Sequence, residues 1–302
     1  MKSTACFNSA VAWFLRGEFV TAQAYAEQAL ELQDLGYSSL YAVISPQDPW
    51  IGALITLSRA LVCLGHLDQA RLRRDEALAK ARQRAHPHTL ALVLASAWDR
   101  DAAVRSEPAL LLERAEELRV HSAEHSFPYF AAIASVYRGS ALSMLGSADE
   151  GLALLKEGLA AYRATGALSS GPNILQLLAD CHRRSGHPKQ GLKDLDEAAA
   201  QIDATQVCHQ EAEMHRLRAE LLVVVDDPVA AEASLHQAIA VARRQSAKLW
   251  ELRAATSLAR LWRDQGKHIE ARDLLAPIYG WFTEGFDTAV LQDAKTLLDQ
   301  LT

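Results

Sequence analysis

Two histidines in an expected helix have the spacing of metal ligands. His121 and His125 are four residues apart, so a helix would project both imidazoles from one face, and Glu124 lies beside them. Imidazole and carboxylate groups are ligands that zinc accepts. The glutamate does not occupy the His-Glu-x-x-His arrangement of zinc proteases, and no further ligand is apparent. We therefore interpret these histidines as surface or packing residues and expect no metal and no other cofactor.

Two short segments have some features of phosphate-binding and catalytic motifs. Gly266-Lys267-His268 places a lysine after a glycine, but a phosphate-binding loop needs an earlier glycine and a following hydroxyl residue. The serines within 166–171 have neither the Gly-x-Ser-x-Gly spacing of a nucleophile elbow nor a strand before them. His86 and His88 flank Pro87 and are more simply turn residues. We therefore expect no catalytic residues and no enzymatic activity.

The charge balance of the chain argues against nucleic-acid binding. The 302 residues carry a net charge of −6, whereas a nucleic-acid-binding surface normally displaces counterions with a basic face. One basic stretch is present, but its side chains spread around the expected helix and are diluted by acidic neighbours. It is interpreted as a solvated face, with an acidic docking patch as the alternative; its residues are Arg71, Arg73, Arg74, Lys80, Arg82 and Arg84.

Several features favour a cytoplasmic protein that does not bind membranes. Half of the residues are apolar, but no uninterrupted apolar run approaches the roughly 20 residues of a membrane span. The first residues lack the features of a secretion signal. The four cysteines are scattered singly, as is typical of reduced thiols rather than of a disulfide framework.

A five-residue spacing recurs along the chain every 40 residues. In each case a glycine or aspartate is followed five positions later by a small residue, as in Gly146/Gly151, Gly186/Gly191, Asp226/Ala231 and Gly266/Ala271. Small residues also recur seven positions before the first member of each pair, at Gly139, Ala179, Ala219 and Ala259. The apolar residues between these sites follow helical periodicity, and most prolines fall where a helix should begin. These patterns predict an all-α array of helical pairs, each with a tight turn at the glycine or aspartate.

The repeat predicts about seven units and a capping helix within a single domain, 1–302. The approximate units are 3–36, 48–86, 87–126, 127–167, 171–206, 207–247 and 248–284, with the cap at 286–302. The third unit is degenerate, because the period predicts Arg105/Leu110 with Trp98 upstream. Pro277 should kink or shorten the second helix of the last unit.

Two apolar segments of the array have more than one interpretation. The insertion 37–47 is apolar enough to pack against the array as a plug, or alternatively to occupy its groove as an internal ligand mimic. Trp281, Phe282 and Phe286 are expected to be buried on the last repeat, with a dimer contact as the alternative.

The pair of small positions with a turn glycine between them resembles the tetratricopeptide repeat, whose usual unit is shorter, about 34 residues. The segments EAEMHRLRAELL at 211–222 and WELRAATSLARLWRDQGKHIEARDLLAPIYGWFTEGFDT at 250–288 are similar to the carboxy-terminal tetratricopeptide region of bacterial class III adenylate/guanylate cyclase-like and AAA-ATPase signalling and transcriptional regulators. This resemblance covers about 48–302. It is poorer at the front, where relatives tend to have Gly-Gly-His-Asp-Pro and this chain has Ser45-Pro46-Gln47-Asp48-Pro49. It implies a right-handed α-solenoid of extended repeats.

The resemblance also implies a binding surface. In tetratricopeptide arrays the first helix of each unit lines the concave face, and the corresponding positions here are Asn173, Gln176, Arg183, Arg216, Glu220, Arg253 and Arg260. The fourth unit contributes nearly apolar residues instead, Ile133, Val136, Ser140 and Ser143. Arginine-rich surfaces suit a peptide or a small acidic ligand, because guanidinium groups bind carboxylates through two hydrogen bonds.

A surface interpretation of the same charges stays open. Arg216 would then pair with Glu220 and Arg183 with Asp180 on a wetted face. Since exposed ion pairs contribute only about 0 to 1 kcal/mol, reversing the charges of Arg216 and Arg260 should change stability little.

The function implied by the resemblance is a non-enzymatic scaffold or regulatory arm that binds a protein or peptide in bacterial signalling. The alternative is a sensor domain for a small acidic metabolite within a transcriptional or ATPase-type regulator. An enclosed pocket between the fourth and sixth units would favour the sensor, and an open trough would favour the scaffold.

Overall fold

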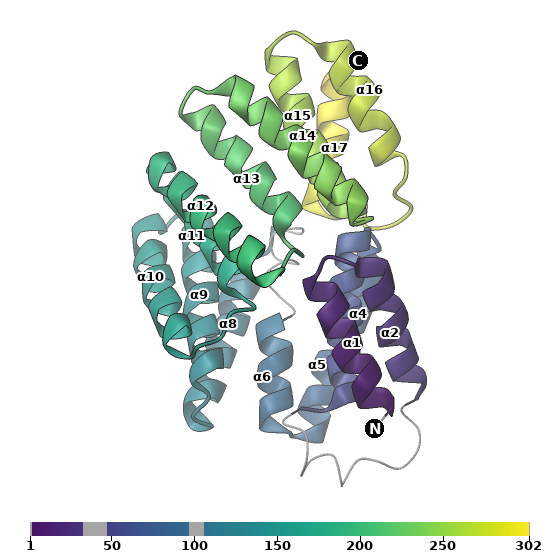
Figure 1. The fold of residues 1–302 in the computed structure, drawn as a ribbon, viewed down its shortest axis with the longest axis vertical. Helices are drawn as coiled ribbons and strands as arrows, with labels where there is room; N and C mark the ends of the chain where they lie inside the picture. The colour runs from purple at the N-terminus through teal and green to yellow at the C-terminus, as the bar shows by residue number, and fades with distance from the viewer. Residues whose placement is uncertain (1, 33–46, 97–105, 302) are drawn as a thin grey trace.

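The computed structural model describes residues 2–32, 47–96 and 106–301, and within these ranges it contains helices and no strand (Figure 1). The expectations for Trp98, Arg105 and nearly all of the insertion 37–47 lie outside the described residues. The first half of the array comprises α1 (Lys2–Leu15), α2 (Phe19–Glu31), α4 (Pro49–Leu64), α5 (Leu67–Arg84), α6 (Pro87–Ser96), α8 (Pro108–Glu124), α9 (Pro128–Met144) and α10 (Ala148–Ala164). The second half comprises α11 (Gly171–Arg184), α12 (Pro188–Thr205), α13 (Glu211–Val224), α14 (Pro228–Arg244), α15 (Lys248–Asp264), α16 (His268–Tyr279) and α17 (Ala289–Gln300).

Prolines and left-handed residues set the ends of the helices. Pro49, Pro87, Pro128, Pro172, Pro188 and Pro228 lie in the first turns of their helices, as predicted, where a missing N–H leaves no hydrogen bond unmade. The connections after α8 contain residues with positive φ at intervals of 20, namely Ser126, Gly146, Gly166, Gly186, Gln206, Asp226, Ser246 and Gly266. The array therefore advances by one helix and one turn every 20 residues.

Pro277 shortens the helix that contains it. It lies inside α16, which ends two residues later at Tyr279 and has 12 residues, whereas the equivalent α14 has 17. The missing N–H and the proline ring disfavour continuation of the helix. The early end is the outcome that the sequence predicted.

The recurring small residues lie where the two helices of a pair touch. A Cβ atom on Gly139 of α9 would lie 2.6 Å from the carbonyl oxygen of Gly151 on α10, and one on Gly151 would lie 2.5 Å from the carbonyl oxygen of Gly139. In the last pair the corresponding Ala259 and Ala271 are fully buried. Small side chains at these positions therefore allow the backbones to approach closely.

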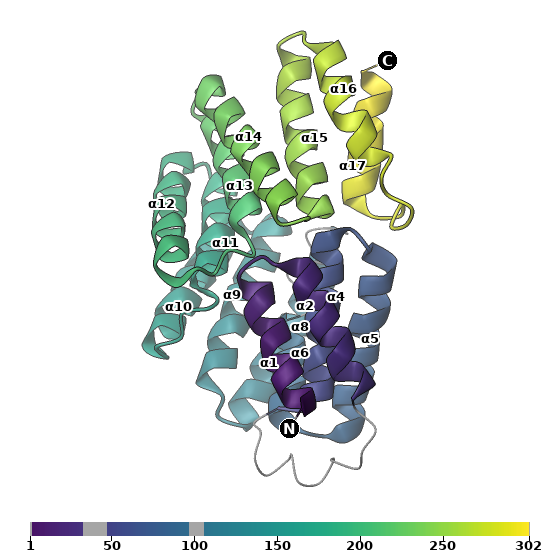
Figure 2. The same cartoon turned by 45° about the vertical axis from the view of Figure 1, so that its right-hand side comes forward.

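The array curves until its two ends touch (Figures 1 and 2). One apolar core joins Phe14 and Phe19 of the first pair to residues of α13 to α17, and a second core runs from α4 to α13. The backbone N–H groups of Cys208 and His209 both donate to the carbonyl of Leu15, at 2.7 and 3.2 Å. Units far apart in sequence thus share one core.

A second closing contact joins the segment after α16 to the beginning of α5. A Cβ atom on Gly65 would lie 2.9 Å from the Trp281 ring, so the indole rests directly on that glycine. Gly285 N–H donates to Asp68 Oδ2 at 3.1 Å, and Gln69 Nε2 donates to Glu284 Oε2 at 3.3 Å. These contacts hold residues 281–285 against the turn between α4 and α5.

The aromatic residues near the C-terminus are buried less than the sequence predicted. Phe282 is buried, but Trp281 and Phe286 are 40% and 48% exposed. Trp281 lies against Gly65 and His66 in the turn after α4, whereas Phe286 contacts Tyr279 of α16. The predicted capping helix is present as α17, and its buried Ala294 and Leu297 belong to the core of the last pair.

Among the helices within 2–32, 47–96 and 106–301, none combines the length and the apolar character that a membrane crossing requires.

Candidate functional site

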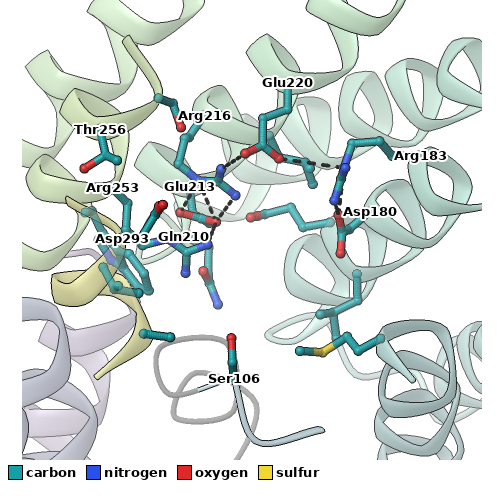
Figure 3. A pocket seen from close by; sticks show the side chains of 18 of the residues that line it. Ser106, Asp180, Arg183, Gln210, Glu213, Arg216, Glu220, Arg253, Thr256 and Asp293 are labelled. Carbon is teal, nitrogen blue, oxygen red and sulfur yellow. Dashed lines mark hydrogen bonds and ion pairs between the residues drawn. The ribbon is translucent and has the colours of Figure 1, made fainter. Parts of the chain in front are cut away.

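A polar cavity of about 400 Å³ lies on the inner side of the array (Figure 3). Its walls come from the first helices of four successive pairs, α9, α11, α13 and α15, together with α17. All seven residues predicted from the repeat line it: Asn173, Gln176, Arg183, Arg216, Glu220, Arg253 and Arg260. The structure therefore brings the predicted residues together in one cavity.

The fourth unit contributes to the cavity differently from the prediction. Ile133 and Val136 are buried in the core between helices and do not line the cavity. Ser143 is likewise buried, and only Ser140 of the predicted four lies on the cavity wall, near Met144. The reason is that α9 packs closely on α10 and α8, which turns most of its predicted face into the core.

Four of the five arginines that line the cavity are held in one network of ion pairs (Figure 3). Arg216 pairs with Glu220 and, at 2.6 Å, with Glu213, which also pairs with Arg253 at 2.9 Å. Both pairings that the sequence analysis considered are present, since Arg216 pairs with Glu220 and Arg183 pairs with Asp180. The remaining links are Arg183 to Asp180 at 2.6 Å, Arg184 to Asp180 at 2.8 Å and Arg183 to Glu220 at 3.7 Å.

The network is not a wetted surface at its centre. Arg216 is only 8% exposed, so it is not the exposed ion pair on which the expected small change in stability was based. The preceding turn of α13 and the neighbouring helices α11 and α15 surround its side chain, which the repeat mapping could not show. Arg260 is different, because it pairs at 2.8 Å with Asp293 of α17 and is 40% exposed.

The pKa directions reflect this burial. Burial alone would raise the pKa of Glu213, but Arg216 and Arg253 outweigh it and hold that pKa below its ordinary value. Burial would likewise raise the pKa of Asp180, but Arg183 and Arg184 outweigh it and hold that pKa below its ordinary value. Burial lowers the pKa of Arg253, and the nearby Arg216 lowers it further. Glu213 opposes this lowering, and Arg253 shares that carboxylate with Arg216.

Two buried hydrogen-bond donors on the cavity wall are left without partners. Gln176 is 5% exposed and Trp250 is 2% exposed, and both line the cavity. Within the described part of the chain, neither Nε2 of Gln176 nor Nε1 of Trp250 has a hydrogen-bond partner. A buried donor without an acceptor costs about 1 to 3 kcal/mol, so a bound acceptor would recover part of this cost.

Sequence reasoning missed several polar or aromatic residues of the wall, among them Gln210, Trp250 and Asp293. Trp250 lies three residues before the predicted Arg253, and Gln210 lies six residues before the predicted Arg216, so extending the stripe towards the start of each helix would have found them. Asp293 lies on the capping helix, which the repeat mapping did not cover.

Comparisons with known proteins bear on the fold. No protein-family model matches the chain, and no curated protein matches it. Among solved structures, a Rap protein complexed with competence and sporulation factor matches with a TM-score of 0.62 and 11% identity, over 99% of this chain and 87% of that one. The apo form of RapI matches with a TM-score of 0.53 and 13% identity, over 99% of this chain and 100% of that one.

A third similar structure carries the name of the repeat. It is a tetratricopeptide repeat protein from Parabacteroides merdae, with a TM-score of 0.51 and 13% identity, over 100% of this chain and 99% of that one. At such identities the similarity concerns the fold alone. The chain therefore has the fold of a tetratricopeptide-like α-solenoid, as its repeat spacing predicted.

Proposed function

We propose that the chain is a non-enzymatic binding module, one continuous array whose inner cavity receives a segment of a protein or peptide partner in bacterial cytoplasmic signalling. The observation that carries the proposal is the pair of buried, unpartnered donors, Gln176 Nε2 and Trp250 Nε1, on the wall of a charged cavity. A polypeptide offers a carbonyl acceptor at every residue, which is what these two donors lack.

The charge of the network supports a ligand that also carries an acidic group. Four guanidinium groups share three carboxylates in the linked set Arg183, Arg184, Arg216, Arg253, Asp180, Glu213 and Glu220. One positive charge is therefore in excess, and Arg253 shares its partner Glu213 with Arg216. A single ligand carboxylate near Arg253 would neutralise this one excess positive charge, whereas a strongly acidic ligand would bring more negative charge than the network can neutralise.

The chemistry of the carboxylates supports a binding role over catalysis. A general base needs a pKa near the operating pH, but arginines hold the pKa values of Asp180 and Glu213 below their ordinary values. Neither histidine nor cysteine occurs among the described residues that line the cavity. The groups available there are suited to holding a ligand.

A similar fold has been solved with a bound factor, the Rap protein complexed with competence and sporulation factor. The likeness is one of fold, so it supports only the general point that such an array can hold a partner. The residues that would do so here are those of the cavity.

The second candidate is a sensor for a small acidic metabolite. Its support is the cavity volume of about 400 Å³, which lies within the range of about 300 to 1,000 Å³ typical of small-molecule sites. The closing contacts between the two ends of the array also favour an enclosed site over an open trough.

The test compares capture by the native chain with capture by Gln176→Leu/Trp250→Phe. These substitutions remove both unpartnered donors and leave the ion-pair network intact. Neither donor has a hydrogen-bond partner to lose, so the thermal melt should fall only through the smaller volume of Phe in the core. Proteins and peptides retained from a bacterial lysate would be identified by mass spectrometry, and native mass spectrometry of the purified chain would reveal a small ligand.

The matched control is Trp262→Phe, which removes an indole N–H that donates to Glu232 at 2.8 Å outside the cavity. A protein or peptide retained by the native chain and this control, but lost with the cavity variant, would support the scaffold. A small molecule with the same pattern would support the sensor. Retention that is equal in all three chains would exclude the cavity as the binding site.

A further inference from the structure

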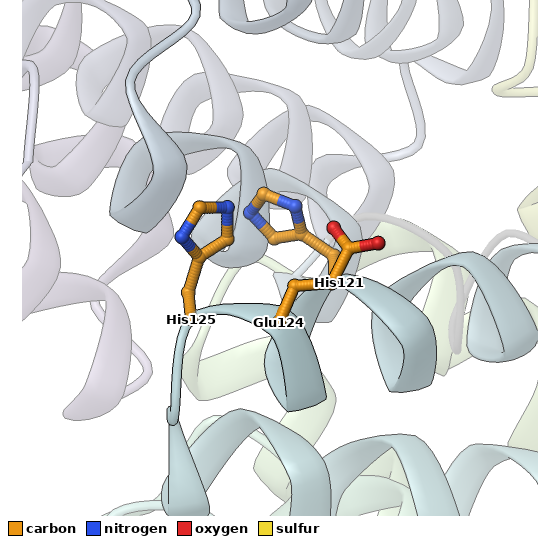
Figure 4. Close-up of side chains that lie close together, drawn as sticks. All are labelled: His121, Glu124 and His125. Carbon is orange, nitrogen blue, oxygen red and sulfur yellow. The ribbon is translucent and has the colours of Figure 1, made fainter.

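A cluster of three potential metal ligands lies at the end of α8, outside the inner cavity. His121, Glu124 and His125 each offer a ligand atom, and these three atoms lie within 4.8 Å of one another. Figure 4 shows the two imidazole rings facing each other, with the Glu124 carboxylate beside the His121 ring. None of the three residues lines the inner cavity.

A contact from another helix fixes the proton of His121. Its Nε2 lies 2.8 Å from the carbonyl oxygen of Pro87, at the start of α6. A carbonyl oxygen only accepts hydrogen bonds, so Nε2 carries the hydrogen and Nδ1 of the neutral ring keeps its lone pair. Metal-binding histidines usually donate their other N–H to a backbone carbonyl or carboxylate in this way.

The ring of His125 is also held in place. It stacks on Phe127 with ring centroids 5.7 Å apart and an interplanar angle of 26°, and its centroid lies 4.6 Å from that of His121. Two imidazolium cations this close would repel each other, whereas two neutral rings can share one cation. The i, i+4 spacing on a helix permits the two imidazole rings to meet, and the contact with Phe127 holds the His125 ring beside that of His121.

Glu124 differs from the other carboxylates on this side of α8. Glu117 is bound by Arg82 and Arg114, at 2.7 and 2.8 Å, and Glu116 is bound by Arg119 and Arg138. Glu124 has no ion pair with any residue that the structure describes. It is therefore the carboxylate of this face that stays available to a cation.

We propose that His121, Glu124 and His125 bind one divalent transition-metal ion of the zinc class. Two imidazole nitrogens and one carboxylate oxygen supply three ligands, and the exposure of Glu124 and His125 leaves the remaining position open to water. The spacing was visible in the sequence, but the sequence-based expectation was that no metal binds, because it could not show the Pro87 and Phe127 contacts. Since His121 also contacts α6, the bound ion would tie the end of α8 to the start of α6 and raise the melting temperature.

The test uses the full chain with any affinity tag removed. Zn²⁺ binding is measured by isothermal titration calorimetry, and Co²⁺ is used as a second probe because its visible absorption reports the ligand set. The native chain should bind one ion, and its melting temperature should rise with added Zn²⁺. His121→Ala/His125→Ala should bind at least about tenfold more weakly and lose the rise.

The matched control is His187→Ala/His268→Ala, which also removes two histidines, both exposed and far from α8. It should bind like the native chain. Because His121 also contacts Pro87, His125→Ala and Glu124→Gln are measured singly; both positions are exposed, so these chains should keep their helical content. Absence of saturable binding by the native chain, or native-like affinity in His125→Ala, would overturn the proposal.

Discussion

Arg216 and Arg260 belong to the same predicted set, but their surroundings differ. Arg216 is buried between two glutamates, whereas Arg260 and its partner Asp293 are both largely exposed. Removing one partner of a buried ion pair costs about 3 to 5 kcal/mol, because the remaining charge stays buried. An exposed pair contributes about 0 to 1 kcal/mol.

We therefore expect Arg216→Ala to lower the free energy of unfolding by about 3 kcal/mol. Arg260→Ala serves as the control and should lower it by less than about 1 kcal/mol. Urea unfolding followed by circular dichroism measures both. Equal losses for the two variants would contradict the burial of the network.

His215 makes stability depend on pH. Burial, together with the nearby Arg218 and Arg244, lowers its pKa to about 4. Between pH 6.5 and about 4 the unfolded chain binds a proton at this histidine and the folded chain does not, so stability falls as the pH falls through this range. The shift corresponds to about 3 kcal/mol at the lower end. Burial and the nearby His86 lower the pKa of His88, so this histidine also makes stability fall as the pH falls.

The measurement is urea unfolding at pH 7, 6, 5 and 4.5 for the native chain and for His215→Gln, whose amide does not titrate in this range. The variant should lose less stability than the native chain on acidification. Parallel curves for the two chains would show that His215 is not kept neutral by its surroundings.

At the scale of elements, close helix contacts depend on single glycines. Gly139→Ala should destabilise the protein by about 1 to 3 kcal/mol, because the new methyl group would meet the Gly151 carbonyl and alanine's higher helix propensity would not compensate. Gly146→Asp is the control. Nothing lies within 4 Å of a Cβ atom there, and Asp226 occupies the equivalent turn with a positive φ. Thermal unfolding of both variants is the measurement, and a larger loss for Gly146→Asp would refute the contact.

Much of this helical organisation could be predicted, since Gly146, Gly186, Asp226 and Gly266 mark one turn in each unit and the prolines mark helix starts. The alternate turns coincide with the predicted unit boundaries at 126, 167–171, 206 and 247, but their left-handed residues, which include Ser126, Gln206 and Ser246, carry no repeated glycine signal. The inner residues of α11, α13 and α15 followed from the repeat. The repeat could not predict the burial of Arg216, the partners of His121 or the contribution of α17 to the cavity, because these depend on contacts between units.

At the scale of the whole molecule, the two ends of the array share a core. Phe14 is fully buried, its ring lies 5.1 Å from that of His209, and the adjacent Leu15 carbonyl accepts from the loop before α13. In an open array each unit contacts only its neighbours, and stability is nearly a sum over units. Here a destabilising substitution in the first helical pair should also destabilise the sixth pair, α13 and α14.

Phe14→Ala should lower the free energy of unfolding by about 3 to 5 kcal/mol. It should also speed amide hydrogen exchange in α13 as well as in α1. The neighbouring Trp13→Ala is the control, because Trp13 is exposed and the effect there should be small and local. Faster exchange confined to α1 and α2 would mean that the closing core contributes no cooperativity.

The contact of Trp281 with Gly65 has a further consequence for how such a chain can change in evolution. Open repeat arrays gain or lose whole units readily, because a duplicated unit stacks on its neighbours wherever it is inserted. A duplication of 40 residues between α9 and α16 would displace Trp281 and Asp68 from their present partners by a full unit. The closing contact thus ties the number of repeats to the shape of the molecule, so a lineage of this protein would have to lose its closure before its array could lengthen.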